Sequence, residues 1–130
     1  MFTGTWSFGE EVIPVDIIST SEKAFIKSYI PQIEAYVNSL SETWKSFLKS
    51  VSPKVIREVK EMELVEETTR LKQSSVKVVN LQILLIEDEE EKLWFTFGFT
   101  LTGVLPKGQS IEYTNNFDRN KEHIEFVSLG

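Results

Sequence analysis

The sequence predicts an α+β domain: an N-terminal β-hairpin and two or three helices packed on one face of an antiparallel β-meander. Two patterns carry this prediction. Apolar and polar residues alternate near both ends of the chain, whereas residues 33–51 repeat their apolar positions at a period near 3.6. The chain has 130 residues, of which 41% are hydrophobic, which is typical of one folded domain. We therefore expect residues 1–130 to form a single α+β domain.

At the N-terminus, residues 2–18 are expected to form a β-hairpin. Apolar side chains share one parity between residues 2 and 8, a Gly-Glu-Glu turn follows at residues 9–11, and residues 12–18 form the return strand. Pro14 has no amide hydrogen to donate to a neighbouring strand. It therefore favours an edge or an irregularity at that point.

The clearest pattern in the chain is a helical stripe of apolar residues. Their steps of three and four place them on one helix face: Ile33, Tyr36, Val37, Leu40, Trp44, Phe47, Leu48 and Val51. Ser19 and Glu22 have the spacing of a capping box before this stripe. Pro31 predicts a kink or a fresh start. Ser52 and Pro53 predict a new helix, with the serine as its N-cap and an end near Glu63.

The second half of the chain predicts strands. Apolar residues alternate between residues 79 and 85, with Val79, Leu81, Ile83 and Leu85 on one face. From residue 93 one face is rich in Phe, and it is expected to pack against Leu40, Trp44, Phe47 and Leu48. The other face is mostly polar: Trp94, Thr96, Gly98, Thr100 and Thr102. A glycine in mid-strand suggests a bulge or a close backbone approach at Gly98. Two shorter strands complete the meander.

Composition excludes several kinds of chemistry. The chain has no Cys and one His, which excludes a disulfide scaffold, a thiol nucleophile, a thiolate zinc site and a pair of His ligands. The net charge is −6 and no segment is basic, so nucleic acid and anionic membranes are not expected partners. No Gly-rich phosphate loop is present. We expect no enzymatic activity, no cofactor and no metal.

An acidic run is the first candidate for a binding site. Its five residues follow one another between the two longest predicted strands: Glu87, Asp88, Glu89, Glu90 and Glu91. Five carboxylates cannot be buried unpaired, so they are expected at a solvent-exposed turn. The run lacks the alternate ligand spacing and the glycine of a calcium loop. Three interpretations remain open: a solvated turn, a surface that attracts a basic protein, and a cation site.

Three other residues are candidates for a functional role. Trp94 lies on the polar face of the best strand, which is either the solvent side of a one-sided sheet or a surface that another protein recognises with this indole as anchor. His123 could act as a general base beside Glu122 or Glu125, but alternation with its apolar neighbours favours an exposed side chain. Asp16 lies in an apolar strand and alternation turns it outward. Neither residue predicts a catalytic site.

In being small, acidic, cysteine-free and α+β, the chain is similar in type to bacterial immunity and inhibitor proteins. The first hypothesis is therefore a non-enzymatic acidic protein-binding module, such as an inhibitor or immunity-type protein, that covers a basic protein partner. The alternative is a small-ligand pocket protein or minimal enzyme of cystatin-like or NTF2-like shape. A third hypothesis is a structural or assembly subunit. The chain shows no signal peptide and no apolar run of membrane-spanning length, which predicts a cytoplasmic location.

Overall fold

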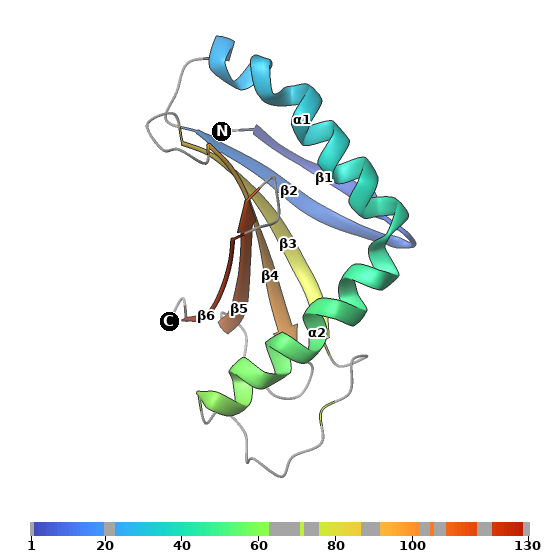
Figure 1. Cartoon of the computed structure of the whole chain (residues 1–130), viewed down its shortest axis with the longest axis vertical. Helices are drawn as coiled ribbons and strands as arrows, with labels where there is room; N and C mark the ends of the chain where they lie inside the picture. The colour runs from blue at the N-terminus through green and yellow to red at the C-terminus, as the bar shows by residue number, and fades with distance from the viewer. Residues whose placement is uncertain are drawn as a thin grey trace.

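Six strands and two helices make up the part of the chain that the computed structural model describes, namely residues 2–19, 23–62, 71, 76–86, 92–101, 105, 109–116 and 121–128. The elements follow one another in the order expected, as a hairpin, then helices, then four strands (Figure 1). Their bounds are β1 Phe2–Phe8, β2 Glu11–Ser19, α1 Lys23–Glu42, α2 Trp44–Glu61, β3 Val76–Leu85, β4 Leu93–Leu101, β5 Gln109–Asn116 and β6 Glu122–Ser128.

The strands form one mixed sheet in the order β1-β2-β3-β4-β5-β6. The N-terminal hairpin and the antiparallel meander of β3 to β6 are both present, which confirms the α+β class. The two parts join through a parallel pair, in which Val15 of β2 lies beside Leu81 of β3. Parallel neighbours need a long crossover, and the two helices provide it. The sheet is therefore mixed and not purely antiparallel.

Both helices cover the same face of the sheet and meet at a bend (Figure 1). The bend lies at Thr43, whose φ of −110° and ψ of 22° are not helical. The new helix expected at Ser52 and Pro53 is wrong, because α2 runs through both residues. The buried side chains Val51, Val55 and Val59 continue on one face across the proline, so packing offsets the hydrogen bond that Pro53 removes. Neither described helix is long and apolar enough to cross a membrane.

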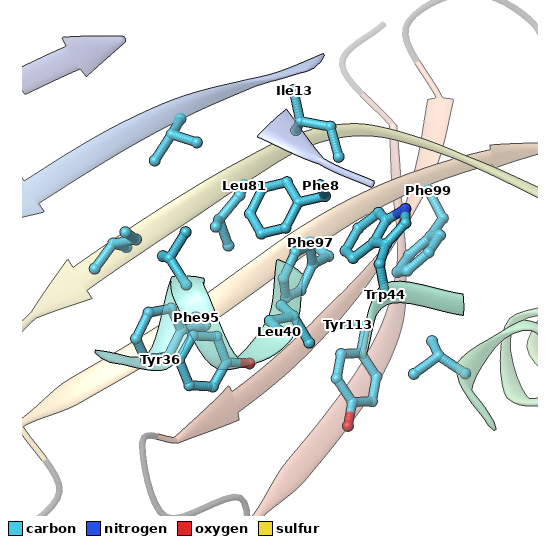
Figure 2. Close-up of a cluster of buried hydrophobic side chains, with 14 of the residues drawn as sticks. Phe8, Ile13, Tyr36, Leu40, Trp44, Leu81, Phe95, Phe97, Phe99 and Tyr113 are labelled. Atoms are coloured by element: carbon cyan, nitrogen blue, oxygen red, sulfur yellow. The ribbon is translucent and has the colours of Figure 1, made fainter. Parts of the chain in front are cut away.

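An aromatic core fills the space between the helices and the sheet (Figure 2). The indole of Trp44 stacks on Phe8 with ring centroids 4.7 Å apart, and the ring of Phe47 lies 4.9 Å from that of Phe97. On α1, the ring of Tyr36 stacks on Phe95. The expected packing of the helical stripe on the Phe-rich strand face is confirmed.

A bulge interrupts the alternation of β3. The pairing of β3 with β4 shifts between Val78 and Asn80, so Val79 falls outside the regular ladder and is 45% exposed. The expectation that Val79 shares a buried face with Leu81 is wrong for this reason. Gly98 pairs with Asn80 at this point, and a Cβ on the glycine would collide with the Asn80 side chain. The close approach expected at Gly98 is confirmed.

Candidate functional site

The sheet has a face opposite the helices, here called the open face. A row of three side chains crosses it, because the register places Ile18 beside Leu84 and Leu84 beside Trp94. All three are partly exposed, and none belongs to the core cluster or to the side chains packed against it. This apolar row lies on the side of the sheet where a one-sided sheet normally carries polar residues.

Polar groups beside the row are ordered by contacts across the strands. Thr96 of β4 and Thr114 of β5 lie opposite each other, and their hydroxyl oxygens are 3.0 Å apart, within hydrogen-bond distance. Thr96 is only 4% exposed. Asn116, which pairs with Trp94, is buried as well. Beside the apolar row, Thr96 and Asn116 are therefore buried positions of the open face.

Two carboxylates oppose each other further along the open face. Glu112 of β5 pairs with Glu125 of β6. The pKa of Glu112 is raised, first by partial burial and then by the negative charge of Glu125. His123 also lies on this face, where its Nε2 is 3.3 Å from Glu125 Oε2. Its side chain is 68% exposed, as alternation predicted. A cation placed between the two carboxylates would relieve their repulsion.

On the helix side of the sheet, β5, β6 and α2 bring four polar side chains together, here called the polar corner. Lys54 Nζ lies 2.9 and 3.0 Å from the two carboxylate oxygens of Glu122. The hydroxyl of Tyr113 donates to Glu122 Oε2 over 2.9 Å, and Asn115 Nδ2 donates to that hydroxyl over 3.2 Å. The chain of contacts runs from a solvent-exposed ion pair to a buried amide.

The polar corner fixes the protonation states of its groups. The hydrogen bonds from Lys54 and then from Tyr113 lower the pKa of Glu122. Burial, followed by the hydrogen bond to Glu122, raises the pKa of the Tyr113 hydroxyl. At neutral pH the carboxylate is therefore ionised and the phenol keeps its proton. The corner therefore holds its hydrogen-bonding groups in fixed positions.

A pocket of about 400 Å³ adjoins this corner. Its lining comes from both helices and from β5 and β6: Tyr36, Leu40, Thr43, Ser46, Phe47, Ser50, Val51, Tyr113, Asn115 and Glu122. Asn115 is 6% exposed, and its Oδ1 accepts no hydrogen bond from the residues that the structure describes. A buried acceptor without a donor is costly, and such groups are normally satisfied by protein, water or a ligand.

A second hollow lies at the tip of the N-terminal hairpin, with a volume of about 440 Å³. Glu10 and Glu11 from the hairpin turn and Glu42 from the end of α1 line it. The buried Trp44 forms part of its wall, and its indole Nε1 donates to Glu11 Oε2 over 3.0 Å. The carboxylate of Glu11 thus has a structural role, because its hydrogen bond with Trp44 holds the hairpin tip against the junction of the two helices.

The residues that the sequence predicted as functional lie in different parts of the molecule. The run 87–91 lies outside the described residues, so its role stays a prediction. Trp94 lies in the apolar row of the open face. Asp16 lies on the same face, because it pairs with Gln82 next to this row.

Sequence reasoning missed the polar corner. Asn115 has the same parity as Ile111 and Tyr113, so a polar residue on the apolar side of β5 was a usable signal. The role of Lys54 could not be recognised from the sequence, because this residue belongs to a helical segment that carries charges on several sides.

No protein-family model, curated protein or solved structure matches the chain. Within the described residues, no group of three or more Asp, Glu or His side chains is placed to hold a metal ion.

Proposed function

We propose that the chain is a non-enzymatic acidic binding module that takes a basic protein partner on its open face, in the manner of an inhibitor or immunity-type protein. The observation that carries this proposal is the partly exposed row of Ile18, Leu84 and Trp94 on the same face as the opposed carboxylates Glu112 and Glu125. An apolar anchor with charged groups around it is the usual composition of a protein interface.

The apolar row supports contact with a protein. Tryptophan is among the residues that contribute most to interfaces, and it does so where its neighbours exclude water. Leu84 lies directly beside Trp94, and Ile18 lies beside Leu84 on the next strand. The two side chains extend the apolar surface around the indole. The row also lies where β3 ends and β4 begins, the two strands that the acidic run 87–91 connects in the sequence.

The charges support a basic partner. The chain carries a net charge of −6, which favours the approach of a positive surface. Glu112 and Glu125 repel each other across two strands, and this repulsion contributes to the raised pKa of Glu112. A Lys or Arg side chain from the partner would be attracted to both carboxylates. Binding would then lower the pKa of Glu112 and release a proton where that group is protonated.

The test uses a partner captured with the wild-type chain and then purified. Replacement of Trp94 by Ala should weaken binding by about tenfold or more, mainly through faster dissociation. Glu112→Gln with Glu125→Gln should slow association at low salt and change dissociation less. Lys49→Ala is the matched control, since Lys49 is exposed on α2, on the covered side of the sheet. Equal affinity of the wild type and Trp94→Ala would overturn the proposal.

A defined probe tests the electrostatic part without any captured partner. An oligolysine peptide should lower the pKa of Glu112, as followed by NMR of its side-chain carboxyl carbon. The shift should shrink in the Glu125→Gln variant, because one of the two attracting charges is removed. If the peptide leaves the Glu112 titration unchanged at low salt, the opposed carboxylates do not attract a basic partner.

A further inference from the structure

We infer that the edge strand β1 is a dimerisation site, where a second copy of this chain adds its own β1 in an antiparallel register centred on Thr5. In the described part of the chain, β1 has a neighbouring strand on one side only, namely β2 (Figure 1). Gly4, Thr5 and Ser7 are exposed. This site does not use Trp94 or the carboxylates of the open face, so it is independent of the proposed partner surface.

The register of the hairpin shows which backbone groups of β1 point outward. A two-residue turn follows Phe8, and its first residue, Gly9, has a φ of 61°. The pair that closes such a turn exchanges hydrogen bonds, and the pairs then alternate along the ladder. Phe8 with Glu11 is this closing pair, so Thr5 with Pro14 is a pair without hydrogen bonds. The proline agrees with this pattern, because it has no amide hydrogen to donate. The amide and carbonyl of Thr5 therefore point away from β2.

The same alternation turns the backbone groups of Thr3 and Ser7 outward. The Ser7 carbonyl agrees with this direction, because it accepts a hydrogen bond from the Ser41 hydroxyl of α1 over 3.1 Å, outside the ladder with β2. A carbonyl oxygen has two lone pairs, so the same atom can also accept from a second strand. A row of outward amides and carbonyls on an exposed edge is a template for another strand.

The two edges of the sheet differ in how they are protected against such pairing. Charged side chains, prolines and bulges are the features that prevent edge strands from pairing. β1 has no charged residue and no proline, and its register with β2 is unbroken. At the opposite edge, β6 carries Glu122, His123 and Glu125. The edge formed by β1 is therefore open to a neutral strand, whereas the edge formed by β6 carries charges.

The sequence of β1 is complementary to itself. An antiparallel register centred on Thr5 places Gly4 of each copy opposite Trp6 of the other. Trp6 is partly exposed and packs against the core, on the helix side of the sheet. A Cβ on Gly4 would meet no atom within 4 Å, so the space beside this glycine is open. Each indole would cover the glycine of the other copy, and an aromatic residue opposite an edge glycine stabilises strand pairing.

Charge distinguishes a second copy from a basic segment at this edge. A basic segment finds no carboxylate in β1, whereas a second β1 brings no like charge into the contact. Two copies that each carry a net charge of −6 repel at longer range. Salt screens this repulsion, so dimerisation should strengthen as salt is added. Binding of a basic partner on the open face should respond to salt in the opposite direction.

Sedimentation equilibrium of the full chain tests the dimer. One copy has a mass of 15.0 kDa. The average mass should rise toward twice this value as the concentration increases from about 10 μM to about 1 mM, because a single pair of edge strands forms a small interface. At a fixed concentration it should also rise with added salt. A mass of one copy on the order of 1 mM would overturn the proposal. A mass beyond two copies would do so as well, since each chain has one β1.

A matched pair of variants at Thr5 tests the location. Thr5→Pro removes the outward amide without removing a bond from the ladder with β2, and it should keep the chain monomeric. Thr5→Val keeps the amide and should dimerise like the wild type. Trp94→Ala, on the open face, should leave the dimer unchanged. Circular dichroism shows whether each variant folds. Dimerisation of folded Thr5→Pro at the wild-type level would show that β1 is not the interface.

Exchanged charges test the register and decide the question even if Thr5→Pro does not fold. Thr5→Glu and Thr5→Lys each place two like charges opposite each other at the centre of the pairing, which should weaken each dimer about fivefold at low salt. An equimolar mixture pairs opposite charges and should have a higher average mass than either variant alone at the same total concentration. A mixture no heavier than the separate variants would show that Thr5 does not face its own copy, which would overturn the proposed register.

Discussion

The two faces of the β5–β6 strand pair differ in what covers them and in the direction in which the pKa of a carboxylate is shifted. On the helix side, Tyr113 and Asn115 lead to Glu122, whose pKa is lowered by Lys54 and by the tyrosine hydroxyl. On the open face, Glu112 opposes Glu125 and its pKa is raised. The β5–β6 pair thus presents the hydrogen-bonded carboxylate of Glu122 to the helices and the repelled carboxylate of Glu112 to the other side. The contacts of Glu122 stabilise its charged form within the fold, whereas the charged form of Glu112 is disfavoured.

A comparison of two tryptophans gives the largest expected effect. Trp44 is 4% exposed and contacts Phe8, Phe47 and Phe97. Its replacement by Ala should lower the free energy of unfolding by about 3–5 kcal/mol. Trp94→Ala on the open face should cost about 1 kcal/mol, since its side chain is only partly buried. Denaturant unfolding measures both values. A loss below about 1 kcal/mol for Trp44→Ala would contradict the role of this residue in the core.

The bulge of β3 gives the next largest effect. Gly98→Ala should destabilise the chain by about 1–2 kcal/mol, because the new Cβ meets the Asn80 side chain. The double variant with Asn80→Ala should recover part of this loss, since the two positions interact directly. Gly4→Ala is the control, because its Cβ would have no atom within 4 Å. If the effects of Gly98→Ala and Asn80→Ala on the free energy of unfolding are additive, the contact between the two positions is not the cause of the destabilisation.

Glu122 and Glu112 are expected to affect the stability of the fold in opposite directions. The lowered pKa of Glu122 stabilises the fold above the pKa of the unfolded chain, and this contribution is lost as the pH falls through the folded pKa. The raised pKa of Glu112 destabilises the fold at neutral pH, and this penalty disappears as the pH falls through the folded pKa. At pH 7, Glu122→Gln should cost up to about 1 kcal/mol and Glu112→Gln should gain a few tenths, roughly, because both side chains are solvent-screened.

Unfolding midpoints measured between neutral pH and roughly pH 3 test this pair of variants. The two differences from the wild type should have opposite signs at neutral pH, and both should approach zero at the acid end. Lys54→Met is a useful companion, because loss of the ammonium should reduce the effect of Glu122→Gln. If Glu122→Gln and Glu112→Gln shift the unfolding midpoint in the same direction at neutral pH, the proposed contrast between the two faces is wrong.

The acidic run gives the smallest expected effect on stability. Replacement of all five residues 87–91 by Gln should leave the midpoint nearly unchanged or raise it slightly, as like-charge repulsion is relieved. Association with a basic partner should slow at low salt, whereas dissociation should change little. Stopped-flow kinetics at two salt concentrations measure this. If the variant associates as fast as the wild type, the run only keeps the protein in solution, and Trp94 and its neighbours carry the interface.

Much of the fold follows from local patterns in the sequence. The hairpin, the helical stripe and the Phe-rich strand depend on periodicity, which short segments display by themselves. The interruption at Thr43 does not, because the apolar stripe continues across it from Leu40 to Trp44. The amide and the hydroxyl of Thr43 both donate to the Ser39 carbonyl in the last turn of α1. The bulge at Val79 was signalled only by Gly98, which pairs with the neighbouring Asn80 and belongs to another strand.

The candidate sites were less predictable. Trp94 was identified because an aromatic residue on a polar strand face is visible in the sequence alone. The polar corner joins Lys54 to residues of β5 and β6 that are far away in the chain, and no local pattern reports such a contact. The opposed pair Glu112 and Glu125 likewise depends on the register of two strands.

The parallel pairing of β2 with β3 has a consequence for the order of folding. The hairpin and the meander contain contacts between near neighbours in the chain, whereas Val15 can meet Leu81 only after both helices have been traversed. Closing so long a segment is entropically costly, so this pairing is expected late in folding. Substitutions at the β2–β3 seam should therefore speed unfolding more than they slow folding.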